Sequence, residues 1–536
     1  MVKRVAIIGA GTSGLVAIKS CLDEGLEPIC FERFGDIGGL WNYQGEVTPE
    51  RASLYKSLLS NVSKGTMCFS DYPIPEDYPL YMRSDSVLEY HRLYAKQFDL
   101  LKYIRFKHTI TSVKKRADFA SSGQWDVVTK DGNDKVASEI FDAVMVCTGL
   151  HTDSYIPFDS FPGIEKFRGK YMHSKDFKEP EVFQGKKVLI VGIANSAGDL
   201  AVEISKHAKK VFLSSRRGTW IMHRITQDGS PMDMVILNRF VIFLLTVLPL
   251  CLINWFAKKT FNFLFNHDNH GPEPEHRFLS ECPMINDDLP SCIKSGNVLM
   301  KRNLKRFTET AVIFEDGTVE EDIEVVIFAT GYTYRFPFLD EKVVKVENNH
   351  AGLYKYVYPP QLEKPTLVFI GYIQPIGAVM PISELQSRGA TRVFKGLIKL
   401  PSTNDMIADV MKIKEITTKK YGTSQGHAAQ VDWIAYLDSL ADMIGVKPSK
   451  MLFLSDPLLA FQIFFGPCTA FQYRLTEPGK WPEARKIILT QWSRIFRAPK
   501  SCLLANDEKQ SSMPLMLQLL AAFVVLAAVL FFFLGA

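Results

Sequence analysis

The chain opens with a pattern of apolar residues that predicts a β-α-β unit. Residues 5–8 form a short apolar run directly before a glycine-rich turn, which is typical of a strand buried on both faces. Residues 13–24 follow with the composition of a helix, and Gly25 marks its end. A second apolar run at residues 28–32 completes the unit within about thirty residues.

The same pattern recurs in the middle of the chain. Lys187–Val191 and Lys210–Ser214 predict two more strands, with a helix over residues 195–207 between them. Two further strand-like runs, at residues 141–147 and 324–329, are each followed by Thr-Gly and flank this second unit. The sequence therefore predicts an α/β protein with two Rossmann-like dinucleotide-binding domains, the second inserted into the first.

Residues 515–536 form the most apolar segment of the chain, with Gln518 as their only polar side chain. At about 1.5 Å per residue, a helix of this length spans roughly 33 Å, which is enough to cross a bilayer core. The basic residues Arg494, Arg497 and Lys500 precede it and favour a protein body on the cytosolic side. We therefore expect a C-terminal membrane helix that anchors the chain in the endoplasmic reticulum (microsomal) membrane.

Residues 240–256 are also strongly apolar, but this segment has only 17 residues and contains Pro249. It is short for a membrane span, so we favour a core or interfacial helix. A substrate entrance that dips into the membrane is the alternative. The predicted domains are the first part of the first dinucleotide-binding domain (1–155), the inserted second dinucleotide-binding domain (156–330), the second part of the first domain (331–445), a C-terminal region (446–512) and the anchor (513–536).

Composition and charge exclude several classes of function. The formal net charge of +5 is small against 63 basic and 58 acidic residues, and no basic run is interleaved with aromatic residues, so nucleic acid is not an expected partner. The nine cysteines are scattered singly, which predicts reduced thiols and no metal site. A disulfide reductase would need a closely spaced dithiol and is therefore excluded.

The first glycine-rich turn, GAGTSG at residues 9–14, lies between a predicted strand and a predicted helix. Gly9 permits the tight turn, Gly11 lets the backbone approach a pyrophosphate, and Gly14 lets the helix pack closely on the strand. Glu32 ends the second strand, where a carboxylate suits the hydroxyl groups of a ribose and repels a 2'-phosphate. These four residues predict a site for FAD.

The second turn, GIANSA at residues 192–197, precedes a strand that ends in Ser-Ser-Arg-Arg instead of an acid. Arginine and hydroxyl groups at that position suit the 2'-phosphate of NADPH. The middle residue is Ala194, whose methyl group lies where the backbone should approach the pyrophosphate, so we expect weakened binding. The residues expected to bind this cofactor are Gly192, Asn195, Ser196, Ser215 and Arg216, with Arg217 assisting.

A chain with both sites can pass hydride between a nicotinamide and a flavin, which selects a flavin-linked oxidoreductase. An amine dehydrogenase and a monooxygenase both remain open on these grounds. The segment FRGKYMHSKDF at residues 167–177 then resembles the FxGxxxHxxx(Y/F) signature of the flavin-containing monooxygenases. The segments GGLW (38–41), SNVSK (60–64), FATGY (328–332) and FGPCTAFQYRL (465–475) are similar too, and the resemblance covers essentially the whole chain.

The resemblance implies a mechanism and further site residues. In that family NADPH reduces FAD, dioxygen forms a C4a-hydroperoxyflavin, and this species oxygenates nucleophilic nitrogen or sulfur atoms of small lipophilic compounds. Asn61 is then the catalytic residue beside the flavin and the nicotinamide, where its amide can both donate and accept hydrogen bonds. The resemblance adds Gly39, Leu40, Trp41 and Gly331 to the cofactor contacts. His173 either orients the two domains or touches the substrate.

Four positions depart from the family pattern, namely Ala194, Val62, Leu150 and Gly389. They raise the alternative of a weakened paralogue that acts as a slow NADPH oxidase and releases hydrogen peroxide. Stretches such as FSDYPIPEDYP are most similar to one isoform group of the vertebrate family, and that likeness adds Baeyer–Villiger oxygenation of ketones as a further alternative. The sequence leaves open whether copies of the chain form a homo-oligomer.

Overall fold

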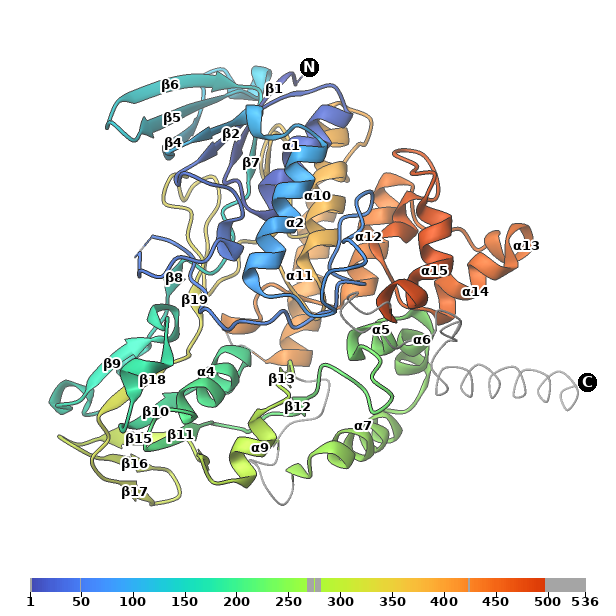
Figure 1. Cartoon of the computed structure of the whole chain (residues 1–536). Helices are drawn as coiled ribbons and strands as arrows, with labels where there is room; N and C mark the ends of the chain where they lie inside the picture. The colour runs from blue at the N-terminus through green and yellow to red at the C-terminus, as the bar shows by residue number, and fades with distance from the viewer. Residues whose placement is uncertain (1, 49, 268–273, 275–280, 423–424, 497–536) are drawn as a thin grey trace, which may run out of the picture.

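The computed structural model describes the chain except for residues 1, 49, 268–273, 275–280, 423–424 and 497–536. Two parallel five-stranded sheets organise it, one in the upper and one in the lower part of Figure 1. The first sheet has the order β20-β7-β1-β2-β3. Its strands are β1 (Arg4–Ile8), β2 (Glu27–Glu32), β3 (Ile104–Phe106), β7 (Ala143–Val146) and β20 (Leu367–Phe369), and α1 (Thr12–Asp23) connects β1 to β2.

The second sheet has the order β14-β11-β10-β18-β9. Its strands are β9 (Lys170–His173), β10 (Lys187–Val191), β11 (Lys210–Ser214), β14 (Val298–Lys301) and β18 (Val325–Phe328), with α4 (Asn195–Ser205) between β10 and β11. All five lie between β7 and β20 in the sequence, so the chain leaves the first sheet after β7 and returns to it with β20. Every strand predicted for the two β-α-β units is present, with ends shifted by about one residue at most. The predicted domain boundaries stay predictions.

Smaller sheets and helices surround these two cores. The small sheets pair β4 (His108–Lys115), β5 (Trp125–Asp131) and β6 (Val136–Phe141); β15 (Leu304–Phe307), β16 (Val312–Phe314) and β17 (Val319–Glu320); β8 (Asp153–Ser154) with β19 (Tyr332–Thr333); β12 (Ile221–Met222) with β13 (Met284–Ile285); and β21 (Gln374–Pro375) with β22 (Gln430–Val431). The other helices include α2 (Ser84–Gln97), α3 (Phe119–Ser122), α5 (Met232–Ile236), α9 (Leu289–Lys294), α11 (Thr403–Tyr421), α12 (Trp433–Ile444) and α15 (Ala484–Phe496).

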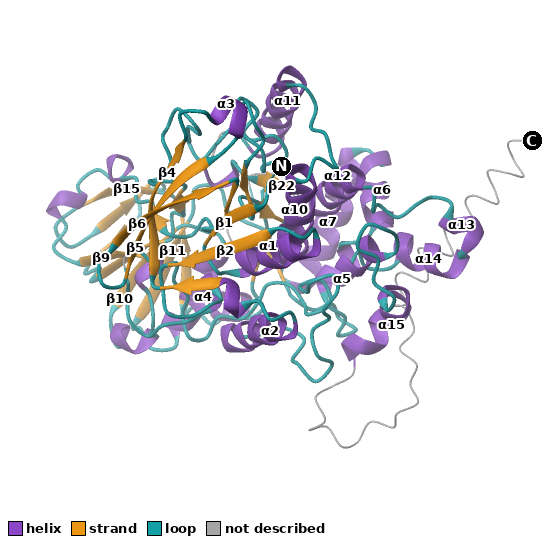
Figure 2. Cartoon of the chain, turned by 90° about the horizontal axis from the view of Figure 1, so that it is seen from above, coloured by secondary structure: helices purple, strands orange, loops and turns teal. Residues whose placement is uncertain are grey.

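Helix α10 (Val379–Phe394) forms the centre of the first unit. It lies side by side with α1 next to the first sheet (Figures 1 and 2), and nearly all of its residues are buried, including charged ones. Such a helix can be buried on all sides only if its polar side chains find partners inside the protein. Ser383 of α10 contacts Ser13 at the start of α1 (Oγ to Oγ 3.0 Å), which ties α10 to the first glycine-rich turn.

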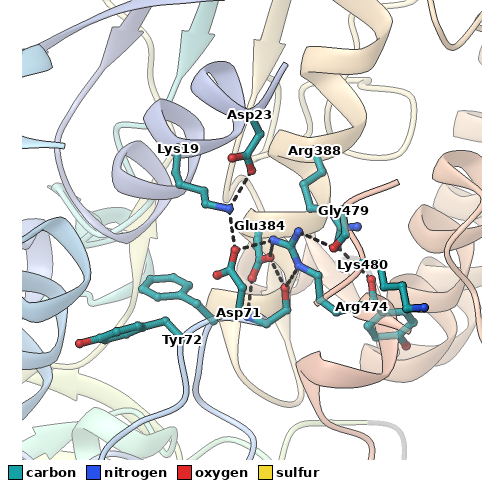
Figure 3. Close-up of polar contacts among 12 residues, drawn as sticks. Lys19, Asp23, Asp71, Tyr72, Glu384, Arg388, Arg474, Gly479 and Lys480 are labelled. Atoms are coloured by element: carbon teal, nitrogen blue, oxygen red, sulfur yellow. Dashed lines mark hydrogen bonds and ion pairs between the residues drawn. The ribbon is translucent and has the colours of Figure 1, made fainter. Parts of the chain in front are cut away.

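A buried ion-pair cluster supplies those partners and attaches the C-terminal region (Figure 3). Arg474, which is 4% exposed, donates through Nη2 to Glu384 Oε1 at 2.6 Å and to Asp71 Oδ2 at 2.9 Å. Glu384 also accepts a 2.7 Å hydrogen bond from the Ser70 amide. Lys19 of α1 reaches the same Asp71 oxygen at 2.6 Å. The cluster therefore joins α1, α10 and the segment before α15.

The apolar segment at residues 240–256 forms two helices, α6 (Arg239–Val247) and α7 (Leu250–Leu264). Pro249 separates them because it lacks an amide hydrogen and its ring restricts the preceding residue. The expectation of a single helix was therefore wrong. Phe240, Ile253 and Phe261 are buried, so part of the segment packs on the protein, while other apolar side chains of α6 and α7 are exposed. Together with α13 (Leu452–Ser455) and α14 (Pro457–Phe465), α6 lies on the side away from the two sheets (Figure 2).

The expected C-terminal membrane helix at residues 513–536 lies outside the described residues. Among the helices that the structure does describe, none combines the length and the apolar character needed to cross a bilayer.

Candidate active site

The first glycine-rich turn is packed too tightly to accept side chains at two of its glycines. Gly9 has φ +100°, and a Cβ atom there would lie 2.8 Å from the Cys147 carbonyl oxygen. A Cβ atom on Gly14 would lie only 1.9 Å from the Gly9 carbonyl oxygen. The start of α1 is thus pressed against the end of β1. Because of this close packing, the free amide groups of the first turn of α1 point beyond the C-terminal end of β1, where a pyrophosphate would bind.

A loop closes over this turn. Gly38 donates its amide hydrogen to the Ala10 carbonyl oxygen at 3.0 Å, and a Cβ atom on Gly11 would lie 3.5 Å from the Gly39 Cα atom. Gly39 is the first residue of the short 3-10 helix Gly39–Trp41, which also contains Leu40. The structure therefore brings the predicted residues of this loop together with the first turn, where the backbone of both segments is accessible to one ligand.

Glu32 lies at the end of β2, as predicted, and is 6% exposed. Its two carboxylate oxygens accept hydrogen bonds from the Ala10 amide at 2.8 Å and the Phe34 amide at 3.0 Å. These bonds fix the carboxylate beside the turn, and each oxygen keeps a lone pair for a ribose hydroxyl. The geometry fits the adenosine half of FAD.

The second turn reproduces the backbone of the first. Gly192 has φ +126°, and a Cβ atom there would lie 2.5 Å from the Ala329 carbonyl oxygen. Ala194 adopts φ −82° and ψ −178°, close to the φ −78° and ψ −166° of Gly11. This extended conformation is open to any residue. The alanine therefore strains no backbone, and only its methyl group can affect a cofactor.

Asn195 and Ser196 begin α4 at this turn. The Asn195 side chain accepts a 2.8 Å hydrogen bond from the Ile285 amide, so its oxygen is engaged by β13 while its amide group remains available to a ligand. Ser196 is exposed. Both residues lie where the amide groups at the helix start can meet phosphate oxygens.

The two arginines at the end of β11 differ in their contacts. Arg217 forms an ion pair with Glu281 at 2.8 Å. Arg216 is exposed, and its side chain forms no hydrogen bond or ion pair within the described part of the chain. Ser215 is buried, and its hydroxyl oxygen accepts the Gly218 amide hydrogen at 2.9 Å, which closes the turn. Arg216 is therefore the group available for a 2'-phosphate, while Ser215 shapes the turn that presents it.

Gly331 and His173 contact each other where β18 and β9, two neighbouring strands of the second sheet, end. Gly331 has φ +88°, and its carbonyl oxygen accepts hydrogen bonds from the Tyr155 amide at 3.0 Å and from His173 Nε2 at 2.9 Å. His173 Nδ1 accepts the Lys175 amide hydrogen at 3.1 Å. Burial lowers the pKa of His173, so the neutral imidazole donates through Nε2 and accepts through Nδ1. These contacts support an orienting role for His173 at the connection between the two units.

Asn61 lies in a partly buried bend between the two nucleotide-type units. Its Oδ1 atom accepts a 2.9 Å hydrogen bond from Nη2 of Arg224, and Arg224 in turn forms an ion pair with Asp287 at 2.9 Å. Sequence reasoning missed both Arg224 and Asp287, because neither belongs to a glycine-rich motif and the pair forms between loops far apart in the sequence. The signal that could have indicated Arg224 is its place shortly after the arginine-ended strand.

The remaining departures from the family pattern have local structural consequences. Gly389 lies buried in α10, where a Cβ atom would lie 2.8 Å from the flexible end of Met443. Neighbouring side chains therefore occupy the space that a larger residue at this position would need. Leu150 is buried in an apolar cluster, and the Val62 carbonyl oxygen accepts the Ser60 hydroxyl at 3.0 Å. Within the described residues no group of histidine, cysteine and acidic side chains could hold a metal ion.

Comparison with known proteins identifies the family. The family model described as "Flavin-binding monooxygenase-like" matches residues 2–534. The chain belongs to this family. It is 55% identical to "Flavin-containing monooxygenase 5" from Cavia porcellus over 513 residues, which is 95% of each chain. It is 52% identical to "Dimethylaniline monooxygenase [N-oxide-forming] 2" from Oryctolagus cuniculus over 534 residues, which is 99% of each chain. The isoform group that the sequence stretches resemble is that of flavin-containing monooxygenase 5, which is among these relatives.

Solved structures of monooxygenases share the fold of this flavin-binding monooxygenase. S-allyl-L-cysteine S-oxygenase from Allium sativum is 27% identical, with a TM-score of 0.64 over 83% of this chain and 89% of that chain. Cyclohexanone monooxygenase from Rhodococcus sp. Phi1 bound to NADP+ is 16% identical, with a TM-score of 0.54 over 83% and 98%. The protein is thus an enzyme and a flavoprotein monooxygenase, and the predicted flavin cofactor is confirmed.

Proposed function

We propose that this flavoprotein uses NADPH and dioxygen to oxygenate nucleophilic nitrogen or sulfur atoms of small lipophilic compounds. The observation that carries the proposal is the presence of two dinucleotide turns with different strand ends, Glu32 in one and Arg216 in the other, in a chain of this family. Two relatives carry names that refer to N-oxide formation and to S-oxygenation. Those names support nitrogen and sulfur as the atoms that receive oxygen.

Each proposed role follows from the contacts of a chain segment. The first turn and Glu32 hold the adenosine and pyrophosphate of FAD, and the start of α4 with Arg216 holds NADPH. FAD, when bound, accepts hydride from NADPH and activates dioxygen. Asn61 offers an amide between the two cofactor sites, and its fixed hydrogen-bonding groups replace those of water there. Substrate selection in such a site depends on access and on the nucleophilicity of the reacting atom.

The experiment that tests the proposal follows the fate of NADPH with three substrates. Purified full-length protein is supplied with a tertiary amine, a sulfide or a cyclic ketone, and NADPH consumed, product and hydrogen peroxide are measured together. We expect near-stoichiometric N-oxide or sulfoxide. Lactone or ester from the ketone alone would instead support Baeyer–Villiger oxygenation. Peroxide equal to NADPH with every substrate would identify an NADPH oxidase and refute the proposal.

We also propose that the protein lies on the cytosolic face of the endoplasmic reticulum membrane, anchored by residues 515–536. Support comes from exposed apolar side chains on α6, α7, α13 and α14, where aromatic contacts such as Phe240 to Phe465 join α6 and α14. Exposed apolar surface of this extent is typical of contact with a membrane or another protein. Its exposed residues are Phe243, Val247, Leu250, Leu252, Trp255, Phe256, Met451, Phe453, Leu454 and Leu458.

Fractionation of cells tests this part of the proposal. The full chain should sediment with microsomes, and a chain that ends at residue 514 should keep its FAD while losing most of its resistance to extraction by salt. Complete retention of the truncated chain on membranes in high salt would assign the attachment to the surface of α6, α7, α13 and α14. Release of the full chain by salt alone would contradict the anchor.

A further inference from the structure

The guanidinium group of Arg224 contacts three different segments of the chain. Its side chain is 7% exposed and lies just after β12. Nη2 donates to Asn61 Oδ1 at 2.9 Å, Nε donates to the Ser60 carbonyl oxygen at 3.1 Å, and Nη1 donates to Asp287 Oδ2 at 2.9 Å. A planar group with bonds on three sides has one orientation. Arg224 is therefore fixed against the bend that carries Asn61.

Asp287 holds both the side chain and the backbone of Arg224. Its Oδ1 atom accepts the Arg224 amide hydrogen at 2.8 Å, while the Arg224 carbonyl oxygen accepts the Tyr81 hydroxyl. Burial alone would raise the pKa of Asp287, but hydrogen bonds from His223 and Arg224 lower it to about 2. The carboxylate is thus ionised at neutral pH and balances the guanidinium charge.

The contact with Arg224 fixes the direction of the Asn61 amide. A guanidinium group has only donors, so Asn61 can form this hydrogen bond only with its oxygen facing Arg224. A rotation of the amide by 180° would place two donors against each other and lose the bond. The Nδ2 donors consequently point away from Arg224, and within the described residues Nδ2 has no partner.

Three consecutive residues connect this arrangement to α4. The Ile285 amide donates to Asn195 Oδ1 at 2.8 Å, and the Asn286 side chain donates to Asp199 Oδ1 at 2.8 Å. Asp287 is the next residue, so residues 285–287 contact both α4 and Arg224. The helix that begins at the second glycine-rich turn is therefore joined by hydrogen bonds to the Asn61 bend.

We propose that Arg224, held by Asp287, is a positioning residue that aims the donor end of the Asn61 amide at the two cofactors. It acts through Asn61 and needs no contact of its own with substrate. The inference rests on the proposed role of Asn61 between flavin and nicotinamide. In a chain without Arg224, the amide is free to present either its oxygen or its nitrogen, and the cofactors lose a fixed donor.

A double-mutant cycle on the FAD-loaded full-length enzyme tests this positioning. The variants are Arg224→Lys, which keeps the charge but loses the planar fork, Asn61→Ala, and both together. NADP+ affinity is measured from the change in flavin absorption during titration, and peroxide released per NADPH is measured in turnover. Each single variant should weaken NADP+ binding about tenfold. The double variant should show about the same tenfold loss because both changes remove one interaction.

Thr66→Val is the matched structural control. Thr66 is buried in the same segment, and its hydroxyl donates to Asp233 Oδ2 at 2.5 Å without touching Asn61. Its NADP+ affinity should stay within about twofold of the parent, and its effect should add to that of Asn61→Ala. An equal loss in Thr66→Val would show that Arg224→Lys acts by general loosening of the segment and would overturn the inference.

The remaining outcomes separate the inference from the proposed function. The positioning role of Arg224 is overturned if Arg224→Lys keeps the parent's NADP+ affinity, or if the double variant binds NADP+ about a hundredfold more weakly than the parent. In either case the proposed role of Asn61 stands. If Asn61→Ala binds NADP+ and releases peroxide as the parent does, both the positioning role of Arg224 and the proposed role of Asn61 are overturned. If Arg224→Lys fails to retain FAD, Asp287→Asn replaces it in the cycle, because it keeps the shape of the partner and removes its charge. Additivity of Asp287→Asn with Asn61→Ala would then refute the inference.

Discussion

Arg216 provides the most direct test of how the enzyme selects NADPH over NADH. The side chain is exposed at the end of β11 and has no partner within the described residues, whereas Arg217 is already paired with Glu281. Arg216→Ala therefore removes the available guanidinium without breaking an internal hydrogen bond or ion pair. The change affects only the bond to the 2'-phosphate, which NADH lacks.

The size of the effect follows from the exposure of the site. A hydrogen bond between charged groups contributes about 1.5–3 kcal/mol, and solvent screening places an exposed arginine at the low end of that range. A loss of about 1.5 kcal/mol corresponds to roughly tenfold weaker binding. Because the interaction is screened by ions, the difference between parent and variant should shrink as salt is raised.

The assay compares Michaelis constants for NADPH and NADH at low and high salt. The value for NADPH should rise about tenfold in Arg216→Ala while that for NADH stays nearly constant. Arg168→Ala is the control, because Arg168 is another exposed arginine of the same unit; it pairs with Glu309 and precedes β9, an edge strand that is not next to β11. An equal loss for NADPH and NADH, or the same change in the control, would refute the assignment of Arg216.

Three further predictions concern packing and charge. Gly14→Ala should yield protein without FAD, seen as loss of the flavin spectrum, because the new methyl group would meet the Gly9 carbonyl oxygen; a full spectrum would contradict this. Ala194→Gly should tighten NADP+ binding about fivefold in calorimetry, the low end of relief from overpacking at about 1 kcal/mol, and no change would show a harmless methyl group. Burial raises the pKa of Glu384, but Arg474 and other partners lower it overall. The contribution of Glu384 to stability is therefore present above the pKa of the unfolded chain, and it is lost as the pH falls through the lower pKa of the folded protein. Glu384→Gln should therefore lower the free energy of unfolding in urea by about 3 kcal/mol at pH 7, with a smaller difference in acid, and an equal difference at both pH values would contradict the account.

Local signals explain why the nucleotide-binding units could be predicted. A strand, a turn that needs glycine, a helix and a second strand follow one another within about thirty residues, so the apolar pattern and the glycines suffice to predict β1, α1 and Glu32. The same reasoning located β10, α4 and β11. Asn61 has no such pattern around it and was found only through the family resemblance.

The parts that could not be predicted depend on contacts between distant residues. Arg224 and Asp287 are separated by 63 positions, and Arg474 lies 90 positions from Glu384. Charged residues in such places are indistinguishable in sequence from ordinary surface residues. The helices α6 and α7 show a different error, because the apolar segment was expected to form a single helix, whereas Pro249 divides it in two.

Labelling with heavy dioxygen tests the central claim most directly. The full-length enzyme is given NADPH, a sulfide or tertiary amine, and ¹⁸O₂ in ordinary water, and the product is analysed by mass spectrometry. Oxygen transfer by a flavoprotein monooxygenase predicts one labelled oxygen atom in each sulfoxide or N-oxide molecule, with NADPH consumed in equal amount. Product without label, or label found only in hydrogen peroxide, would contradict the proposal that this enzyme is an oxygenase of nitrogen and sulfur nucleophiles.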